Sequence, residues 1–215
     1  EPSMTPDGTL AGARSGSGSF RIHAQGKSTH AGRDLFGGRN AIIALAEVAT
    51  RLHKLSKKDN SLLVNIARFS ADSPLNQVPD AATCALNIRI KSKADLDFFK
   101  VKLHEILKKV ESESQCKLSY SGSISRPPKP LDKKQEKLFN LVKECGKELN
   151  MDINWKSAGG VCDGNNLASC GLPVVDTLGV RGGCIHSDKE FVHLNSLAER
   201  AKLSTLILYK LAQKA

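Results

Sequence analysis

The chain has 215 residues, of which 40% are hydrophobic and 25% charged, and its formal net charge is +10. This composition supplies one or two globular domains with real cores. No apolar run approaches the roughly 18 residues that a membrane-spanning helix needs. Aromatic residues make up only 5%, which argues against a stacking platform for single-stranded nucleic acid. The lysines are interleaved with acids on predicted helix faces, as on a solvated surface, so we expect neither nucleic acid nor a membrane as partner.

The first half of the chain alternates between strand and helix patterns. Side chains alternate between apolar and polar where strands are expected, and apolar residues recur every three or four positions where helices are expected. The predicted elements are strand 19–25, helix 39–56, strands 62–69 and 83–90, helix 94–111 and strand 117–123. This order is the ferredoxin-like βαββαβ arrangement. We expect it to occupy residues 16–126.

A proline-rich connector at residues 126–130 leads to a second region with a different pattern. Strands again alternate with helices, which indicates a layered α/β domain. The predicted features are a helical face with Leu138, Leu141, Cys145 and Leu149, strand 153–155, helix 163–169, buried strand 173–178, and a final helix with Leu197, Ala201, Ser204, Leu208 and Leu211. We expect residues 1–15 and 127–215 to be the later half of this domain.

His186 lies in a glycine-rich turn, after Gly182 and Gly183 and before an apolar strand start. Glycines allow close approach of the backbone, so this setting is typical of a metal-ligating imidazole. A lone histidine in a turn is more often polar surface. Other segments are therefore needed to decide its role.

Six motifs occur in order along the chain. They are Glu-Pro at 1–2, Gly-Lys-x-x-His-Ala-Gly at 26–32, Asn-x-x-Pro at 76–79, Asn-x-Arg at 87–89, Gly-Gly-x-x-Asp-Gly-Asn at 159–165 and His-Ser-x-x-Glu at 186–190. Each is weak alone, but six in register are specific. Together they resemble the zinc-dependent aminoacylase and glutamate carboxypeptidase family. That family has a two-zinc α/β catalytic domain interrupted by a smaller dimerisation domain.

The resemblance implies two metal ligands in this chain. Glu1 would bind one zinc through its carboxylate and His186 the other, with two zinc ions per subunit. A solvated terminal glutamate is the alternative for Glu1. The family's other ligands are a His-x-Asp motif, a bridging aspartate and a Glu-Glu pair, and they lie upstream of these residues. We therefore expect the sequence to begin inside a longer protein and to be inactive alone.

The resemblance also assigns residues to the substrate. His30 would reach the active site of the neighbouring subunit and donate a hydrogen bond to the oxyanion, with bridging water as nucleophile and zinc as Lewis acid. Asn76 and Arg89 would bind the free α-carboxylate, since a guanidinium offers it two parallel donors. The alternatives are a turn histidine and a solvent-facing edge-strand arginine.

The backbone at Gly159 and Gly160 would contact substrate. Val161 and Cys162 depart from the family, which has a third glycine and a small hydroxyl residue there; a β-branched valine disfavours positive φ. We expect Cys162 to be a passive thiol and Asp163 to orient the loop and cap the next helix. The six cysteines show no CxxC pair, so we expect reduced thiols and favour a cytoplasmic location.

The implied reaction is hydrolysis of an amide beside a free carboxylate, as in a carboxypeptidase that releases a C-terminal amino acid such as glutamate from a small peptide. An N-acyl-amino-acid deacylase is the close alternative, and a non-catalytic dimerisation or scaffold module is another. We expect a homodimer formed through residues 16–126, because an open sheet leaves an edge strand that needs cover.

Overall fold

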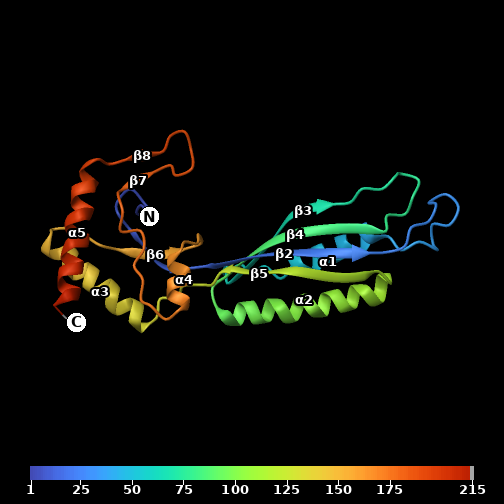
Figure 1. Ribbon diagram of the computed structural model, residues 1–215, viewed down its shortest axis with the longest axis horizontal. Coiled ribbons are helices and arrows are strands. Elements are labelled where there is room, and N and C mark those ends of the chain that lie inside the picture. Colours follow the sequence, from blue (N-terminus) through green and yellow to red (C-terminus); the bar gives the residue numbers. More distant parts are fainter. Residues whose placement is uncertain (214–215) are drawn as a thin grey trace. The chain divides into compact units, whose positions relative to one another are not determined.

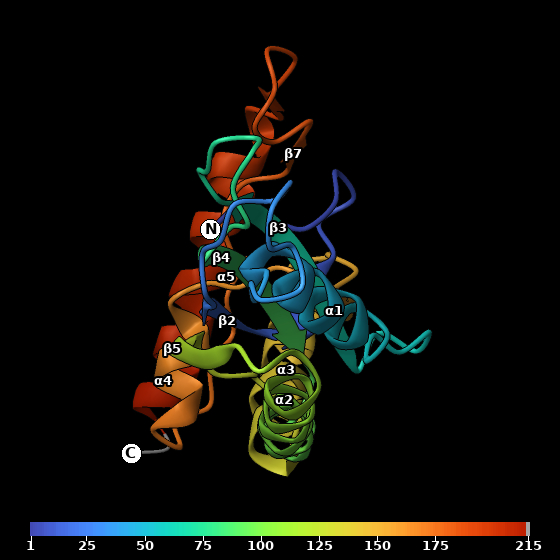
Figure 2. The ribbon, with the colours of Figure 1, turned by 90° about the vertical axis from the view of Figure 1, so that its right-hand side faces the viewer.

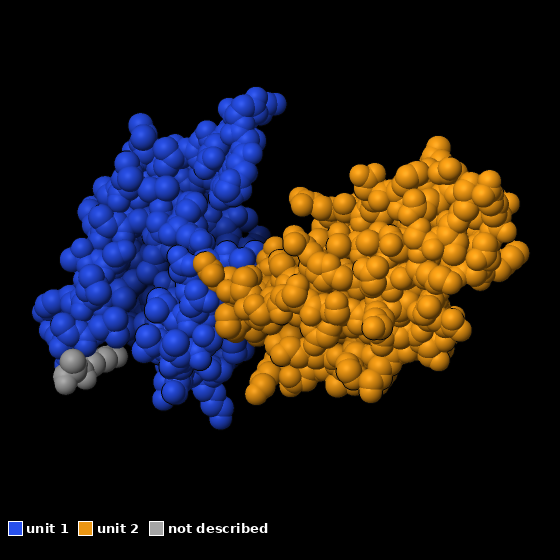
Figure 3. Space-filling model, turned by 45° about the vertical axis from the view of Figure 1, so that its right-hand side comes forward, with its two compact units in different colours: residues 1–15, 129–215 blue, residues 16–128 orange. Residues whose placement is uncertain are grey.

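The computed structural model describes residues 1–213 and separates into two compact units (Figure 3). Unit 2 is Gly16–Pro128, and unit 1 combines Glu1–Ser15 with the chain from Lys129 onward. The second junction falls after residue 128, whereas the sequence predicted it after residue 126. Lys129 belongs to unit 1 because its backbone exchanges two hydrogen bonds with Arg14, at 2.8 and 3.0 Å.

Unit 2 is a four-stranded antiparallel sheet with two helices (Figure 1). Its elements are β2 Gly16–Gln25, α1 Ala41–His53, β3 Leu62–Ser70, β4 Ala81–Ile90, α2 Lys93–Ser114 and β5 Lys117–Arg126. The strand order is β3-β4-β2-β5, so β3 and β5 are the edges. This βαββαβ topology confirms the fold class predicted from the sequence.

Both helices of unit 2 cover the same face of the sheet (Figure 2). The core between them is apolar, with Ile22, Leu45, Ile88 and Phe99 fully buried. Along β4, every second side chain points into this core, and the intervening side chains, including Arg89, are half-buried on the opposite face. The period of the strand therefore decides which residues remain available for function.

Unit 1 contains a short parallel pair of strands packed with helices. Its elements are β1 Leu10–Arg14, α3 Lys133–Glu148, β6 Trp155–Ala158, α4 Gly164–Ser169, β7 Gly182–Gly183, β8 Phe191–Val192 and α5 Asn195–Ala212. β1 pairs with β6, and β7 pairs with β8. Leu10, Phe139 and Leu203 form a buried core against which Trp155 packs. Within residues 1–213, no helix is both long and apolar enough to cross a bilayer.

Several predictions for unit 1 were wrong in detail. Residues 173–178 do not form a strand; only Asp176 makes an isolated bridge, to Ala11. Side-chain contacts replace ladder hydrogen bonds there: the Gln135 side chain accepts from the Val174 N–H, and the Thr177 hydroxyl accepts from the Ala11 N–H of β1. The short strand predicted at 153–155 lies at β6, two residues later.

The final helix exists, but its buried face is not the predicted one. Leu197, Leu208 and Leu211 are exposed. The face that packs inward carries Ser196, Arg200, Leu203 and Ile207. The buried Arg200 guanidinium donates from Nη2 to the Gly8 carbonyl at 3.1 Å, and its Nε lies 3.4 Å from the Glu199 carboxylate.

Candidate active site

Residues 1–3 lie against the segment that leads to His186. The Gly179 N–H donates to the Glu1 carbonyl at 2.9 Å, and the Ser3 N–H donates to the Val180 carbonyl at 3.0 Å. Residues 179–180 directly precede the hairpin of β7 and β8, whose loop carries His186. The N-terminal segment with Glu1 thus pairs with the chain just before the hairpin whose loop carries His186.

The Glu1 carboxylate is held by Arg14, the last residue of β1. Nη2 of Arg14 donates to Glu1 Oε2 at 2.9 Å and to Asp176 Oδ1 at 2.8 Å. Nε of Arg14 lies 3.0 Å from both Asp176 oxygens, and Nη1 donates to the Gly160 carbonyl at 3.4 Å. One guanidinium therefore joins the N-terminal segment, the glycine loop and Asp176.

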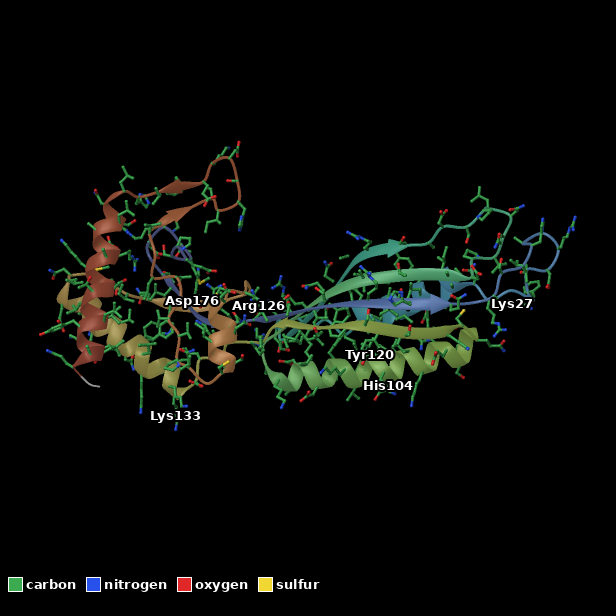
Figure 4. The ribbon with its side chains drawn as sticks, viewed as in Figure 1. Lys27, His104, Tyr120, Arg126, Lys133 and Asp176 are labelled. Atoms are coloured by element: carbon green, nitrogen blue, oxygen red, sulfur yellow. The ribbon has the colours of Figure 1, made fainter. Side chains whose placement is uncertain are left out.

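Asp176, labelled in Figure 4, is the anion that balances this group. Lys129 is fully buried and its Nζ donates to Asp176 Oδ2 at 2.7 Å. Burial alone would raise the pKa of the Asp176 carboxyl, but hydrogen bonds from Arg14 and Lys129 and the Lys129 charge hold that pKa below its ordinary value. Asp176 is therefore ionised at neutral pH.

One set of three potential metal-ligating side chains occurs in the described part of the chain: Glu1, Cys162 and Asp176, whose ligand atoms lie within 4.8 Å of one another. Two carboxylates there already face two cations, Arg14 and Lys129. Burial raises the pKa of the Cys162 thiol, and its hydrogen bond to Asp176 at 3.2 Å raises it further. A protonated thiol and a carboxylate paired through both oxygens make Cys162 and Asp176 poor metal ligands, whereas among the described residues Glu1 is engaged only through Oε2.

Two potential metal-ligating groups, the Oε1 atom of Glu1 and the His186 ring, remain unengaged by the described residues. Among residues 1–213, neither Glu1 Oε1 nor the exposed His186 ring makes a hydrogen bond. The His186 backbone has φ +67, in the left-handed region, and its N–H donates to the Glu190 carboxylate at 3.3 Å. Such strained backbone in a non-glycine residue is concentrated at functional loops. A carboxylate oxygen and an imidazole are donors that suit a divalent transition metal.

The glycine loop is open above Gly159. A Cβ added at Gly159 would meet no atom within 4 Å, so the backbone is accessible to another molecule. Val161 is not among the residues with positive φ, and the expected conflict with a β-branched residue does not arise. Asp163 is the N-cap residue of α4, as predicted, but its side chain makes no capping hydrogen bond. Asn165 organises the loop instead, accepting from the Cys162 N–H and donating to the Ser15 carbonyl.

His30 and Asn76 come together at one end of unit 2. The Ala31 N–H donates to the Asn76 carbonyl at 2.8 Å, and His30 forms an isolated bridge with Gln77. His30 is exposed, and its Nδ1 accepts from the Gly32 N–H at 3.1 Å. In a neutral imidazole this arrangement leaves the proton on Nε2, which is then a free donor.

Arg89 is not at that end. It lies near the end of β4, opposite Ser17 and Leu63, whereas Asn76 precedes the start of the same strand. Eight residues of extended chain separate Ala81 from Arg89, which is about 26 Å. Nη1 of Arg89 is buried and has no hydrogen-bond partner among residues 1–213. Within one subunit, Asn76 and Arg89 therefore do not form the predicted pair.

Residues 12–115 match the family model of the peptidase dimerisation domain of M20 peptidases. The chain therefore contains a peptidase dimerisation domain of the M20 type. It is 26% identical over 222 residues to carboxypeptidase G2 of Pseudomonas sp. (strain RS-16), covering 98% of this chain and 51% of that protein. It is 26% identical over 137 residues to succinyl-diaminopimelate desuccinylase of Psychrobacter sp. (strain PRwf-1), covering 63% of this chain and 33% of that protein.

Solved M20-type structures share the fold along nearly the whole chain. Aminopeptidase PepT of Bacillus cereus matches with a TM-score of 0.83 and 21% identity, over 95% of this chain and 54% of that one. The YXEP protein of Bacillus subtilis, described as a dinuclear metal-binding peptidase of the M20 family, matches with a TM-score of 0.74 and 16% identity, over 96% and 54%. The chain thus spans about half the length of the relatives it matches.

Sequence reasoning predicted roles for Glu1 and the glycine loop but missed the residues that connect these two segments. Arg14, Lys129 and Asp176 carry no motif, and they meet only through contacts between segments far apart in the chain. One signal was available. Lys129 stands between two prolines in the sequence. In the structure it is fully buried, and a buried lysine requires an anionic partner.

Proposed function

We propose that the full-length protein containing this chain is a metal-dependent amide hydrolase that cleaves small peptides bearing a free α-carboxylate, like a carboxypeptidase. The observation that carries the proposal is the junction at Arg14. It fixes Glu1 beside the glycine loop while leaving Glu1 Oε1 and the space over Gly159 open. A carboxylate oxygen that could ligate a metal and an accessible stretch of backbone that could contact substrate thereby lie on segments joined by one side chain.

Glu1 and His186 would each hold one of two zinc ions, and the remaining ligands would come from other residues of the full-length protein. The metals supply Lewis acidity and activate water. The resemblance to zinc-dependent relatives supports zinc, and the donor types agree with it. His30 would donate from Nε2 to the oxyanion, because its Nδ1 is already engaged by Gly32.

A two-fold dimer reconciles the positions of Asn76 and Arg89. β3 is an exposed edge, and its Leu63 and Phe69 side chains are 36% and 41% exposed. Antiparallel pairing of two β3 edges would set the Arg89 end of one sheet beside the Asn76 end of the other. Each carboxylate site would then combine Arg89 of one subunit with Asn76 and His30 of the partner.

The first test measures metal content and hydrolysis by the full-length protein. We expect bound metal and cleavage of a dipeptide ending in free glutamate, with poor cleavage of its amidated analogue. Cleavage of N-acyl-glutamate without dipeptide cleavage would favour the deacylase. A protein without metal or hydrolysis would be a dimerisation or scaffold module, and the proposal would be wrong.

The second test asks whether His30 acts in the active site of the neighbouring subunit. His186→Ala should lose metal at one position, and His30→Ala should keep its metal but lose roughly 10²- to 10³-fold in rate. Mixing the two inactive variants should restore some activity, because one site of the mixed dimer keeps both residues. No recovery in verified heterodimers would show that His30 does not act across the dimer.

A further inference from the structure

Arg14 contacts both halves of the proposed site through a single rigid group. Its side chain is only 6% exposed. Nη2 holds Glu1 Oε2 at 2.9 Å, and Nη1 donates to the Gly160 carbonyl at 3.4 Å. A guanidinium is planar, so its donors cannot move independently. The relative position of the carboxylate and the loop is therefore fixed by one side chain.

Asp176 holds the guanidinium itself in place. It accepts from both Nε and Nη2 of Arg14, and its own position is fixed by Lys129 at 2.7 Å and by the Cys162 thiol at 3.2 Å. Lys129 is in turn anchored to the Val174 carbonyl at 3.3 Å. These contacts leave Arg14 little rotational freedom. Because Asp176 offsets part of the Arg14 charge, the guanidinium orients Glu1 without presenting a full positive charge to a neighbouring cation.

We propose that Arg14 is the positioning residue of the metal and substrate site. It holds the Glu1 carboxylate through Oε2, which would leave Oε1 free to ligate a metal, and it ties the glycine loop to the same guanidinium. This role rests on the proposed function, in which Glu1 binds metal. Residues that hydrogen-bond to a metal ligand orient it and tune its affinity. Arg14 acts through Glu1 and touches neither metal nor substrate.

The Arg14→Lys variant tests whether the planar geometry of the guanidinium matters apart from its positive charge. Arg14→Lys keeps the cation for Asp176 but cannot reach Glu1, Asp176 and Gly160 together, because an ammonium is a point charge on a flexible stem. In the full-length protein, we expect Arg14→Lys to weaken Zn²⁺ binding by roughly 10- to 100-fold, measured by competition with a chelator. Arg39→Lys, at an exposed arginine of unit 2, is the matched control and should bind Zn²⁺ like the wild type.

A double-mutant cycle tests whether Arg14 acts through Glu1. In a Glu1→Gln background, Arg14→Lys should cause no further loss of Zn²⁺ affinity, because the ligand that Arg14 orients is already gone. Equal losses in both backgrounds would show that Arg14 acts by another route and would overturn the proposal. The proposal would also be overturned if Arg14→Lys bound Zn²⁺ as tightly as the wild type while its Trp155 fluorescence showed that unit 1 is folded.

Thiol labelling gives a readout that needs no metal. Cys162 is buried and hydrogen-bonded to Asp176, Cys145 is buried in the core, and Cys170 is exposed. In the 215-residue chain, Arg14→Lys should speed alkylation of Cys162 while Cys145 stays protected and Cys170 reacts as before. An unchanged Cys162 rate would contradict the claim that Arg14 fixes the loop. Absence of metal from the wild-type full-length protein would instead refute the proposed function.

Discussion

Replacing Asp176 by asparagine tests the charge balance of unit 1. The change is nearly isosteric, but it removes the anion shared by two buried cations. The Lys129 side chain is 0% exposed and the Arg14 side chain 6% exposed. Asparagine keeps a carbonyl oxygen for one hydrogen bond and cannot neutralise either charge. Arg14 retains its contact with Glu1, whereas Lys129 loses its anionic partner.

The expected loss follows from this difference between the two cations. Breaking a buried ion pair by removing one partner costs about 3–5 kcal/mol, and because Arg14 keeps Glu1, we expect about 3 kcal/mol. For a protein of this size, that loss lowers the melting temperature by roughly 6–12 °C. Lys129→Met added to Asp176→Asn should recover part of the loss, since it removes the unpaired cation.

Trp155 makes the measurement specific to unit 1. It is the single tryptophan of the chain and packs against Phe139, with ring centroids 4.9 Å apart. Urea unfolding followed by its fluorescence therefore reports the stability of unit 1. Asp188→Asn, at an exposed aspartate of the same unit, should leave the transition unchanged. A loss below about 1 kcal/mol for Asp176→Asn would refute the reasoning, because the buried ion pairs of Asp176 would then contribute no more than exposed salt bridges do.

Three further outcomes are expected. The folded-state pKa of Asp176 lies below its unfolded value, so its charge stabilises unit 1 above about pH 4. This stability is lost as the pH falls further. An acid titration followed by Trp155 fluorescence should show the loss in the wild type and not in Asp176→Asn. Gly122→Ala should destabilise unit 2, because the φ of Gly122 is +122 and the new Cβ would lie 2.2 Å from the Ser19 carbonyl oxygen; circular dichroism measures the loss. The control variant Gly159→Ala should change the stability of the chain by less than about 0.5 kcal/mol. Leu45→Ala, in the fully buried core of unit 2, should cost about 2–5 kcal/mol by the same measurement.

Unit 2 could be read from the sequence because its local pattern and its tertiary packing agree. The strand period along β4 places Cys84, Leu86 and Ile88 against the helices, and the side-chain caps at Asn40 and Ser92 mark where those helices begin. When propensity, period and capping indicate the same element, a single sequence suffices to predict it.

Unit 1 is different because tertiary contacts override local periodicity there. In α5, the row of Leu197, Ala201 and Leu208 is as good a helical stripe as the buried one, and only packing against the rest of unit 1 selects the face with Arg200 and Leu203. At 173–178, a strand-like apolar run contacts the Gln135 side chain through the Val174 N–H and the Ala11 N–H through the Thr177 hydroxyl. Neither Gln135 nor Ala11 can be identified from the run itself.

The predicted site residues show the same division between local and distant information. A motif identifies a chemical group and its local turn, so Glu1, His30 and the glycine loop could be named from sequence. It carries no information on the distance between groups contributed by different segments. Asn76 and Arg89 are thirteen positions apart in the chain, yet the part of β4 from Ala81 to Arg89 that lies between them is itself about 26 Å long. Arg14 and Gly160 are far apart in sequence but share a hydrogen bond. A carboxylate-binding pair of Asn76 and Arg89 therefore requires two subunits, and the orientation of Glu1 requires a residue that no motif contains.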